Sequence, residues 1–311
     1  MIDHKVLNWF NSLSASSVRI RFSEGWCHLY FSNTFRNHIC PLLLDIFTSF
    51  IGVTITVQNW SIFVKHVTYL SSILRYSSLT LASMLTGVWF LMQRKKYYLL
   101  VENLLHFDQC FSLIANTWSI ETEASFTRIQ IRLLIVSHVA ITIIYIASFV
   151  WLGEYGFYSK ILIICCVFIG FHFMLQQLYA VFFAEHLAER YCLLSRVVSQ
   201  NSSQKILVQT LKLYDQLGGM QIMVSEVFGI SCVITTLVVF LHTAVVFYSE
   251  MIYLAQGIPI AMIVAEVVTM IPIMVLFYAI MYSFDKLIVE ILAAIVTYIM
   301  ILFQFKDFEK T

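Results

Sequence analysis

Long uncharged stretches limit how this chain can fold more than any other feature of its sequence. Residues 133–153, 161–184 and 227–249 contain no Asp, Glu, Lys or Arg. Each is long enough to cross the hydrocarbon core of a bilayer as a helix, which takes about 20 residues. Backbone polar groups find no water in lipid, so such a stretch must satisfy its hydrogen bonds internally. The three stretches therefore predict membrane-spanning helices.

Composition excludes the main alternative classes of protein. The 311 residues are 60% hydrophobic and 12% charged, and their mean hydropathy is +0.83. A soluble domain is about 25% charged, so a water-soluble globular protein is excluded. Disorder and a collagen-like chain are excluded too, because there are 10 Gly, 3 Pro and many aromatic side chains. The predicted fold class is all-α, a polytopic membrane protein.

Four further apolar stretches bring the predicted number of transmembrane helices to seven. Each contains a single acidic or basic residue. The stretches are 42–64, 67–92, 251–283 and 287–305, with Asp45, Arg75, Glu266 and Glu290 as their charged residues. Only residues 283–286 separate the last two. Four residues are enough to join two antiparallel helices, so we expect the chain to reverse direction there.

Basic residues predict the orientation in the membrane. With a cytosolic N-terminus, 14 of the 19 Lys and Arg fall on the cytosolic side and 4 on the outside, while Arg75 lies within a span. This asymmetry favours a cytosolic N-terminus and an extracellular C-terminus. The predicted parts are a cytosolic segment 1–40, a seven-helix domain 41–305 and an extracellular tail 306–311. Cytosolic helical extensions are expected at 93–132 and 185–226.

Polar side chains at membrane depth are candidates for function. A buried charge or imidazole in lipid is costly, and aromatic walls with a few hydrogen-bonding groups suit a small organic ligand. We therefore expect a ligand site within the helical bundle, at the middle of the membrane or in its outer half. Its candidate residues are Arg75, Tyr76, Tyr145, His172, His242 and Glu266. The alternative interpretation is that these groups only pair with one another and tie helices together.

Short sequence patterns also bear on glycosylation, metal binding and nucleic-acid binding. Asn59 begins a glycosylation sequence, Asn-Trp-Ser, near the outer end of the first predicted span. The seven Cys include no Cys-x-x-Cys pair, so no metal site, catalytic residue or cofactor is expected. No basic cluster suggests nucleic-acid binding, and membrane lipid is the expected surrounding.

The end of the last predicted span carries a short motif. It reads Thr297-Tyr298, then five apolar residues, then Gln304-Phe305. This resembles the C-terminal signature of the insect gustatory receptors, which stands in the final span close to the end of the chain. A lone Gln in an apolar helix is costly in lipid unless it finds a partner or water, and a ring of such residues could line a pore.

The resemblance implies a receptor and a channel. Members of that family look like ligand-gated, non-selective cation channels in the plasma membrane of sensory neurons, where they transduce taste. They assemble as homo- or hetero-tetramers with other gustatory receptors and bind a small-molecule tastant. The family usually has an extra half-helix before its last span, which residues 283–286 are too short to form. The implied pore or gate residues are Thr297, Tyr298, Phe303, Gln304 and Phe305.

Two other classes stay open as alternatives. A G-protein-coupled seven-helix receptor is favoured by Glu189-Arg190-Tyr191, although this triplet follows the fourth predicted span rather than the third. A membrane transporter or enzyme would need paired catalytic or metal-binding groups, and no such motif is found in the sequence. The chain is therefore not expected to be an enzyme.

Overall fold

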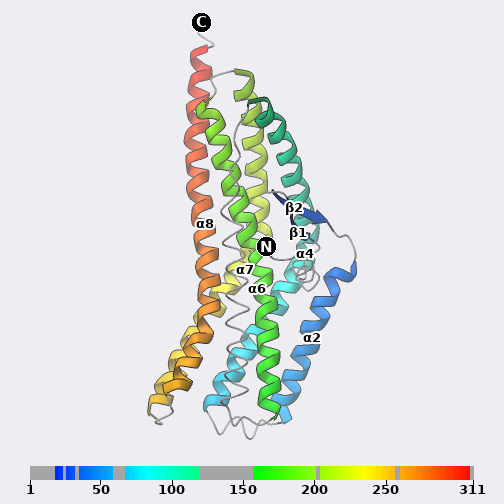
Figure 1. Cartoon of the computed structure of the whole chain (residues 1–311), viewed down its shortest axis with the longest axis vertical. Coiled ribbons are helices and arrows are strands. Elements are labelled where there is room, and N and C mark those ends of the chain that lie inside the picture. Colours follow the sequence, from blue (N-terminus) through cyan, green and yellow to red (C-terminus); the bar gives the residue numbers. More distant parts are fainter. Residues whose placement is uncertain are drawn as a thin grey trace. The chain divides into compact units, whose positions relative to one another are not determined.

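Five helices make up most of the described chain. The computed structural model describes residues 18–23, 26–31, 35–58, 67–118, 157–200, 204–255 and 260–308. The predicted helical fold is confirmed for these residues apart from one short hairpin (Figure 1). The helices are α2 (Phe35–Gln58), α4 (Val67–Trp118), α6 (Phe157–Gln200), α7 (Gln204–Ala255) and α8 (Ile260–Phe308).

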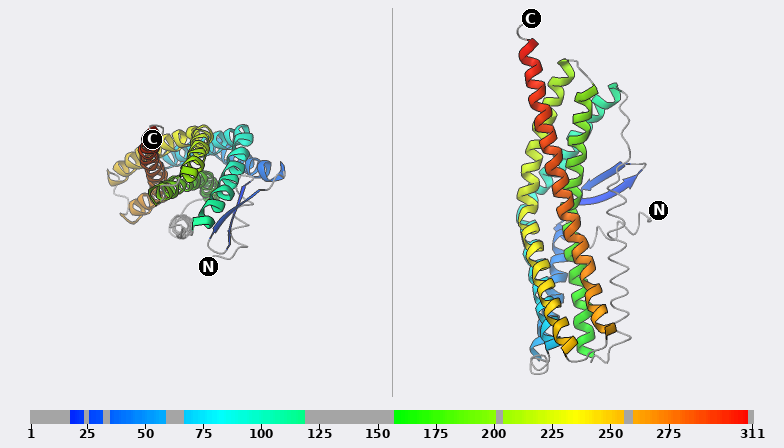
Figure 2. Two further views of the ribbon diagram at one scale, coloured as in Figure 1. Left: turned by 90° about the horizontal axis from the view of Figure 1, so that it is seen from above. Right: turned by 90° about the vertical axis from the view of Figure 1, so that its left-hand side faces the viewer.

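A short two-stranded antiparallel hairpin precedes the helices. Strand β1 (Val18–Ser23) pairs with β2 (Trp26–Phe31), as Figure 2 shows. Ile20 lies opposite Leu29, and Arg21 lies opposite His28. Apolar and basic residues alternate along the sequence of β1, a period of two that is typical of a strand.

The chain divides into two compact units, each described separately below. Unit 1 consists of Met1–Met92, Arg128–Leu178 and Ile230–Tyr278. Unit 2 consists of Gln93–Thr127, Tyr179–Gly229 and Ala279–Thr311. Four of the helices, α4, α6, α7 and α8, contribute residues to both units.

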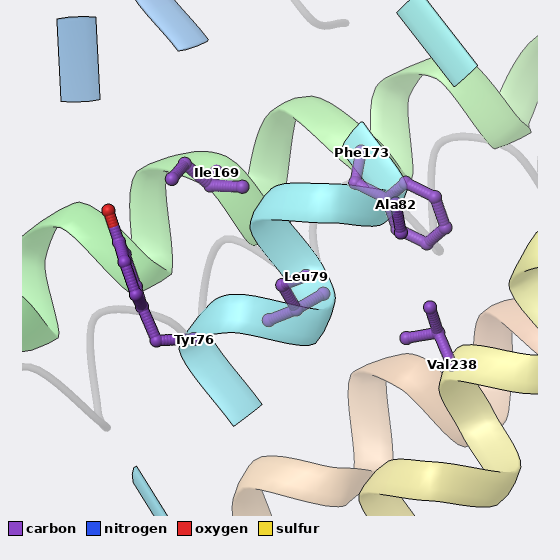
Figure 3. Packing of buried hydrophobic residues seen from close by; sticks show 6 residues of the cluster. All are labelled: Tyr76, Leu79, Ala82, Ile169, Phe173 and Val238. Atoms are coloured by element: carbon purple, nitrogen blue, oxygen red, sulfur yellow. The ribbon is translucent and has the colours of Figure 1, made fainter. Parts of the chain in front are cut away.

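The core of unit 1 is an apolar cluster contributed by α4, α6 and α7. Helical spacing places its members on one face of each helix, three or four residues apart. All are less than a tenth exposed. The members are Tyr76, Leu79 and Ala82 on α4, Ile169 and Phe173 on α6, and Val238 on α7 (Figure 3).

Helix α2 joins this core through a close approach to α4. The hydroxyl of Tyr76 donates a hydrogen bond to the carbonyl oxygen of Thr48 over 2.9 Å. A Cβ atom at Gly52 would overlap the Tyr76 phenol. Glycine is therefore the residue that lets the two helices approach here, because it has no side chain to displace the ring.

The core of unit 2 is aromatic. The ring of Tyr97 on α4 meets Tyr179, Phe183 and Phe228 edge-on, with centroids 6.5, 5.6 and 6.2 Å away. Edge-to-face contacts of this kind add to the stabilisation that burial gives. Because these rings belong to α4, α6 and α7, the cluster fixes the three helices of unit 2 against one another.

Helix α7 contains the best candidate for a membrane span. Among the described residues, the segment Val208–Ile252 is the one helix long and apolar enough to cross a bilayer. Large apolar side chains along it are exposed, including Val233, Leu237 and Phe240. Exposed apolar surface of this extent is typical of contact with lipid or another protein. The number of seven spans stays a prediction.

Helix α8 corrects the expected connection between the last two spans. It runs without a break from Ile260 to Phe308, through residues 283–286. A helix of 49 residues is about 74 Å long at 1.5 Å per residue, more than twice the thickness of a bilayer core. Residues 283–286 contain neither Gly nor Pro, so nothing in the local sequence ends the helix. The predicted reversal of the chain at this point was wrong.

Candidate functional site

Neutral side chains link the helices of unit 1. Thr86 on α4 donates a hydrogen bond to the Oε1 atom of Gln176 on α6 over 2.5 Å. The next residue, Gln177, donates from Nε2 to the hydroxyl oxygen of Ser231 on α7 over 2.7 Å. All four side chains are buried. Amide and hydroxyl pairs of this kind join helices in an apolar environment without introducing a charge.

Two of the expected ligand residues lie together in unit 1. Arg75 on α4 and His242 on α7 are both buried, and they are close enough to interact electrostatically. The Nδ1 atom of His242 lies 3.2 Å from the carbonyl oxygen of Val238. Tyr76 is buried as well, but its hydroxyl is engaged with the backbone of α2, so its contacts are those of a packing residue.

The other expected site residues are less fully described. His172 belongs to α6 and Glu266 to α8, but their side chains lie outside the described residues. The same holds for Tyr298, Phe303, Gln304 and Phe305, which belong to α8. Tyr145 and Asn59 lie outside the described residues altogether. Arg75, Tyr76 and His242 are thus the residues of the predicted ligand site whose side chains the structure describes.

Ion pairs link the helices of unit 2. Arg190 on α6 binds the carboxylate of Asp108 on α4 with two hydrogen bonds, from Nε over 2.8 Å and from Nη2 over 2.5 Å. Two parallel bonds make this the stronger, geometrically specific form of ion pair. The Nη1 atom of Arg190 also donates to the carbonyl oxygen of His186 over 2.8 Å. The arginine of the Glu189-Arg190-Tyr191 triplet therefore fixes α4 to α6.

A second ionic contact joins α6 to α8. The carboxylate of Glu185 is 1% exposed and accepts hydrogen bonds from Ser283 over 2.9 Å and from Lys286 over 2.6 Å. Burial acts to lower the pKa of Lys286, but the hydrogen bond and the charge of Glu185 outweigh it, and the net pKa is raised. Lys286 is therefore charged at neutral pH, and the pair holds α8 on α6.

His186 lies beside these pairs and is held neutral. Its ring meets Phe182 edge-on at 4.1 Å, and its Nδ1 atom is 3.5 Å from a carboxylate oxygen of Glu189. Burial lowers the pKa of His186 below its ordinary value of 6.5, and Arg190 lowers it further, against the opposing effect of Glu189. A neutral imidazole therefore sits next to the charged groups at pH 7.

Thr297, the first residue of the C-terminal motif, contacts α6 in unit 2. Its Oγ1 atom lies 3.4 Å from the hydroxyl oxygen of Ser195. The contact between Glu185 and Lys286 lies earlier along both helices. From the earlier of these two contacts to the later, the residue numbers increase along both helices. Helices α6 and α8 therefore run parallel within unit 2 (Figure 1). Thr297 therefore lies beside the end of α6 that follows its apolar stretch.

The sequence held a weak signal for the contact between α6 and α8. Ser283 and Lys286 are three residues apart, which places them on one face of a helix. Because residues 283–286 are expected to form a loop, this spacing does not indicate a shared face in the sequence. Nothing in the local sequence marks Glu185 as their partner. Among the described residues, no group of three or more His, Cys, Asp or Glu lies close enough to hold a metal ion.

Comparisons with known proteins add no family to this description. No protein-family model matches the chain, and no curated protein matches it. The C-terminal motif is therefore the observation from which a function can be proposed.

Proposed function

We propose that this chain is a subunit of a ligand-gated cation channel of the insect gustatory receptor type, located in the plasma membrane of a sensory neuron. The observation that carries the proposal is the ending Thr297-Tyr298…Gln304-Phe305 on the last helix. The helical fold and the exposed apolar face of α7 support a membrane protein. In this proposal the chain crosses the membrane several times and assembles as a tetramer.

Unit 1 supplies the groups that would bind the tastant. Arg75 and His242 lie together among buried apolar side chains. Gln176 is 2% exposed, and its Nε2 amide has no hydrogen-bond partner in the part of the chain that the structure describes. An amide donor and an imidazole suit a small ligand that carries hydroxyl or carbonyl oxygens. Replacing His242 by Phe should therefore raise the ligand concentration needed for half-maximal response.

Helix α6 is the element that would transmit ligand binding. It carries Gln176 in unit 1 and Glu185 in unit 2, nine residues apart on one continuous helix. Glu185 in turn holds α8 through Ser283 and Lys286. In the proposed mechanism, a shift of α6 on ligand binding moves α8 through this ionic contact, and the ring of residues near Gln304 widens.

The membrane orientation is the first test of the proposal. Epitope tags at each end of the full chain would be stained on intact and on permeabilised cells. The proposal expects the N-terminal tag to need permeabilisation and the C-terminal tag to be accessible on intact cells. The expected result corresponds to an odd number of membrane crossings between the two tags. If both tags need permeabilisation, the last segment does not cross and the pore proposal fails.

The role of Gln304 is the second test. In cells expressing the chain with and without a second gustatory receptor subunit, Gln304→Ala should change single-channel conductance or cation selectivity. The matched control is Val296→Ala, an exposed apolar position on the same helix, which should leave selectivity unchanged. Tagged surface protein is measured for each variant. Equal selectivity of Gln304→Ala and the unmodified channel would place the pore elsewhere.

A further inference from the structure

His106 and Cys110 form a pair on the surface of unit 2. They are four residues apart on α4, so both side chains lie on the same face, one turn from each other. The Sγ atom of Cys110 is 3.6 Å from the Nε2 atom of His106. His106 is exposed and Cys110 is half-buried, so a solvated ion can reach both atoms.

This distance is the one that a tetrahedral zinc site requires. Zinc binds thiolate sulfur at about 2.3 Å and imidazole nitrogen at about 2.0–2.1 Å. At a tetrahedral angle, these two bonds place sulfur and nitrogen about 3.6 Å apart. The separation of the two donor atoms therefore fits an ion that both of them bind.

We propose that His106 and Cys110 bind a thiophilic divalent cation, with Zn²⁺ as the best match. The ion replaces the thiol proton, so Zn²⁺, the Cys110 thiol and the neutral His106 imidazole give one Zn–S bond, one Zn–N bond and one proton released to the buffer. Water or a group from another molecule fills the two remaining positions. Sulfur and imidazole together favour zinc and copper over magnesium and calcium.

The chain offers matched controls for this site. Cys192 on α6 and Cys232 on α7 are also free, half-buried thiols on helices. Among the described residues, neither has a histidine nitrogen recorded beside it, as Cys110 has. The proposal therefore expects Zn²⁺ to protect Cys110 selectively. The inference stands apart from the proposed channel function, since it needs no current or ligand.

The experiment measures alkylation of each cysteine by mass spectrometry in the full-length protein in lipid nanodiscs. With Zn²⁺ in molar excess, alkylation of Cys110 should slow about tenfold or more, and that of Cys192 and Cys232 should not. His106→Gln should abolish most of this protection, because even an outer partner of a metal ligand is worth about 10- to 100-fold in affinity. Equal protection in His106→Gln, or equal protection of all three cysteines, would overturn the proposal.

The absorption of bound cobalt is a second measurement, and it does not depend on how readily a reagent reaches the thiol. Co²⁺ added to the unmodified protein should give a thiolate-to-cobalt charge-transfer absorption that is lost in Cys110→Ser and displaced by Zn²⁺. Cys110→His keeps two ligands at the same spacing and should bind Zn²⁺ without that absorption. Size-exclusion profiles check that each variant is folded. An absorption that persists in Cys110→Ser would assign the metal to another cysteine.

Discussion

Unit 1 and unit 2 hold their helices together with different chemistry. The contacts across unit 1 include neutral hydrogen bonds, such as Thr86 with Gln176 and Tyr76 with the backbone of α2. Those across unit 2 include ion pairs, such as Asp108 with Arg190. Breaking a buried ion pair leaves an uncompensated charge, which costs more than losing a neutral hydrogen bond, so the two kinds of contact should respond differently to substitution.

The two units also differ in whether side-chain shape or side-chain charge positions a helix. In unit 1 a glycine allows close approach, and an aromatic ring fills the space. In unit 2 a buried carboxylate, Glu185, fixes the position of α8 through two donors. Unit 1 should therefore respond most to changes of side-chain volume, and unit 2 to changes of charge.

The largest effect is expected at Gly52 in unit 1. Gly52→Ala places a methyl group where the Tyr76 phenol lies, and should lower the free energy of unfolding by roughly 3 kcal/mol. The measurement is the thermal midpoint of the purified protein in detergent. Gly219→Ala is the matched control in unit 2, where a Cβ meets nothing within 4 Å. The control should be neutral or stabilising by up to about 1 kcal/mol. Equal effects would contradict the packing described for α2 and α4.

A smaller effect is expected from the buried carboxylate of unit 2. Glu185→Gln leaves Lys286 without its counter-charge, and should cost about 2 kcal/mol, between the values for exposed and buried pairs. Lys286 is 35% exposed, which limits the penalty. The double variant with Lys286→Leu should recover much of the loss in thermal midpoint. Recovery distinguishes a charge effect from general damage to α6, and its absence would show that the ion pair is not the cause.

Protonation of His186 gives a pH dependence that unit 2 should show. The pKa of His186 is lowered in the folded state, so below pH 6.5 the unfolded chain binds a proton that the folded chain does not. Stability is therefore fully present above about pH 6.5 and falls as the pH drops, by less than about 1 kcal/mol at about pH 6. His186→Phe should flatten the thermal midpoint between about pH 7.5 and 6. An unchanged slope in this variant would assign the effect to another group.

The smallest effect is expected from the neutral pair of unit 1. A double-mutant cycle with Gln176→Leu and Thr86→Val should give a coupling energy of about 0.6 kcal/mol, typical of hydrogen bonds between membrane helices. The Thr86 hydroxyl also donates to the carbonyl oxygen of Ala82, so it keeps a partner when Gln176 is replaced. A coupling as large as that of the Glu185–Lys286 pair would remove the contrast between the units.

The positions of the apolar helices were predicted from the sequence. The residues at which these helices end, and the helices that they contact, were not. Apolar runs located α6 and α7, and the helical extensions beyond them follow from the spacing of apolar residues. For the candidate site, Arg75 and His242 were named from the sequence, but their closeness within unit 1 depends on how α4 packs on α7.

The sequence by itself determined that this chain forms long apolar helices, because only a backbone that bonds to itself can carry so much apolar surface. Tertiary structure alone decided which polar groups meet. Glu185 and Lys286 are 101 residues apart, and no local pattern pairs them. The same contact engages Ser283 and Lys286 from one face of α8, which is continuous where the sequence suggested a turn. A buried carboxylate needs hydrogen-bond donors, and only the packing of α8 on α6 brings these two to Glu185.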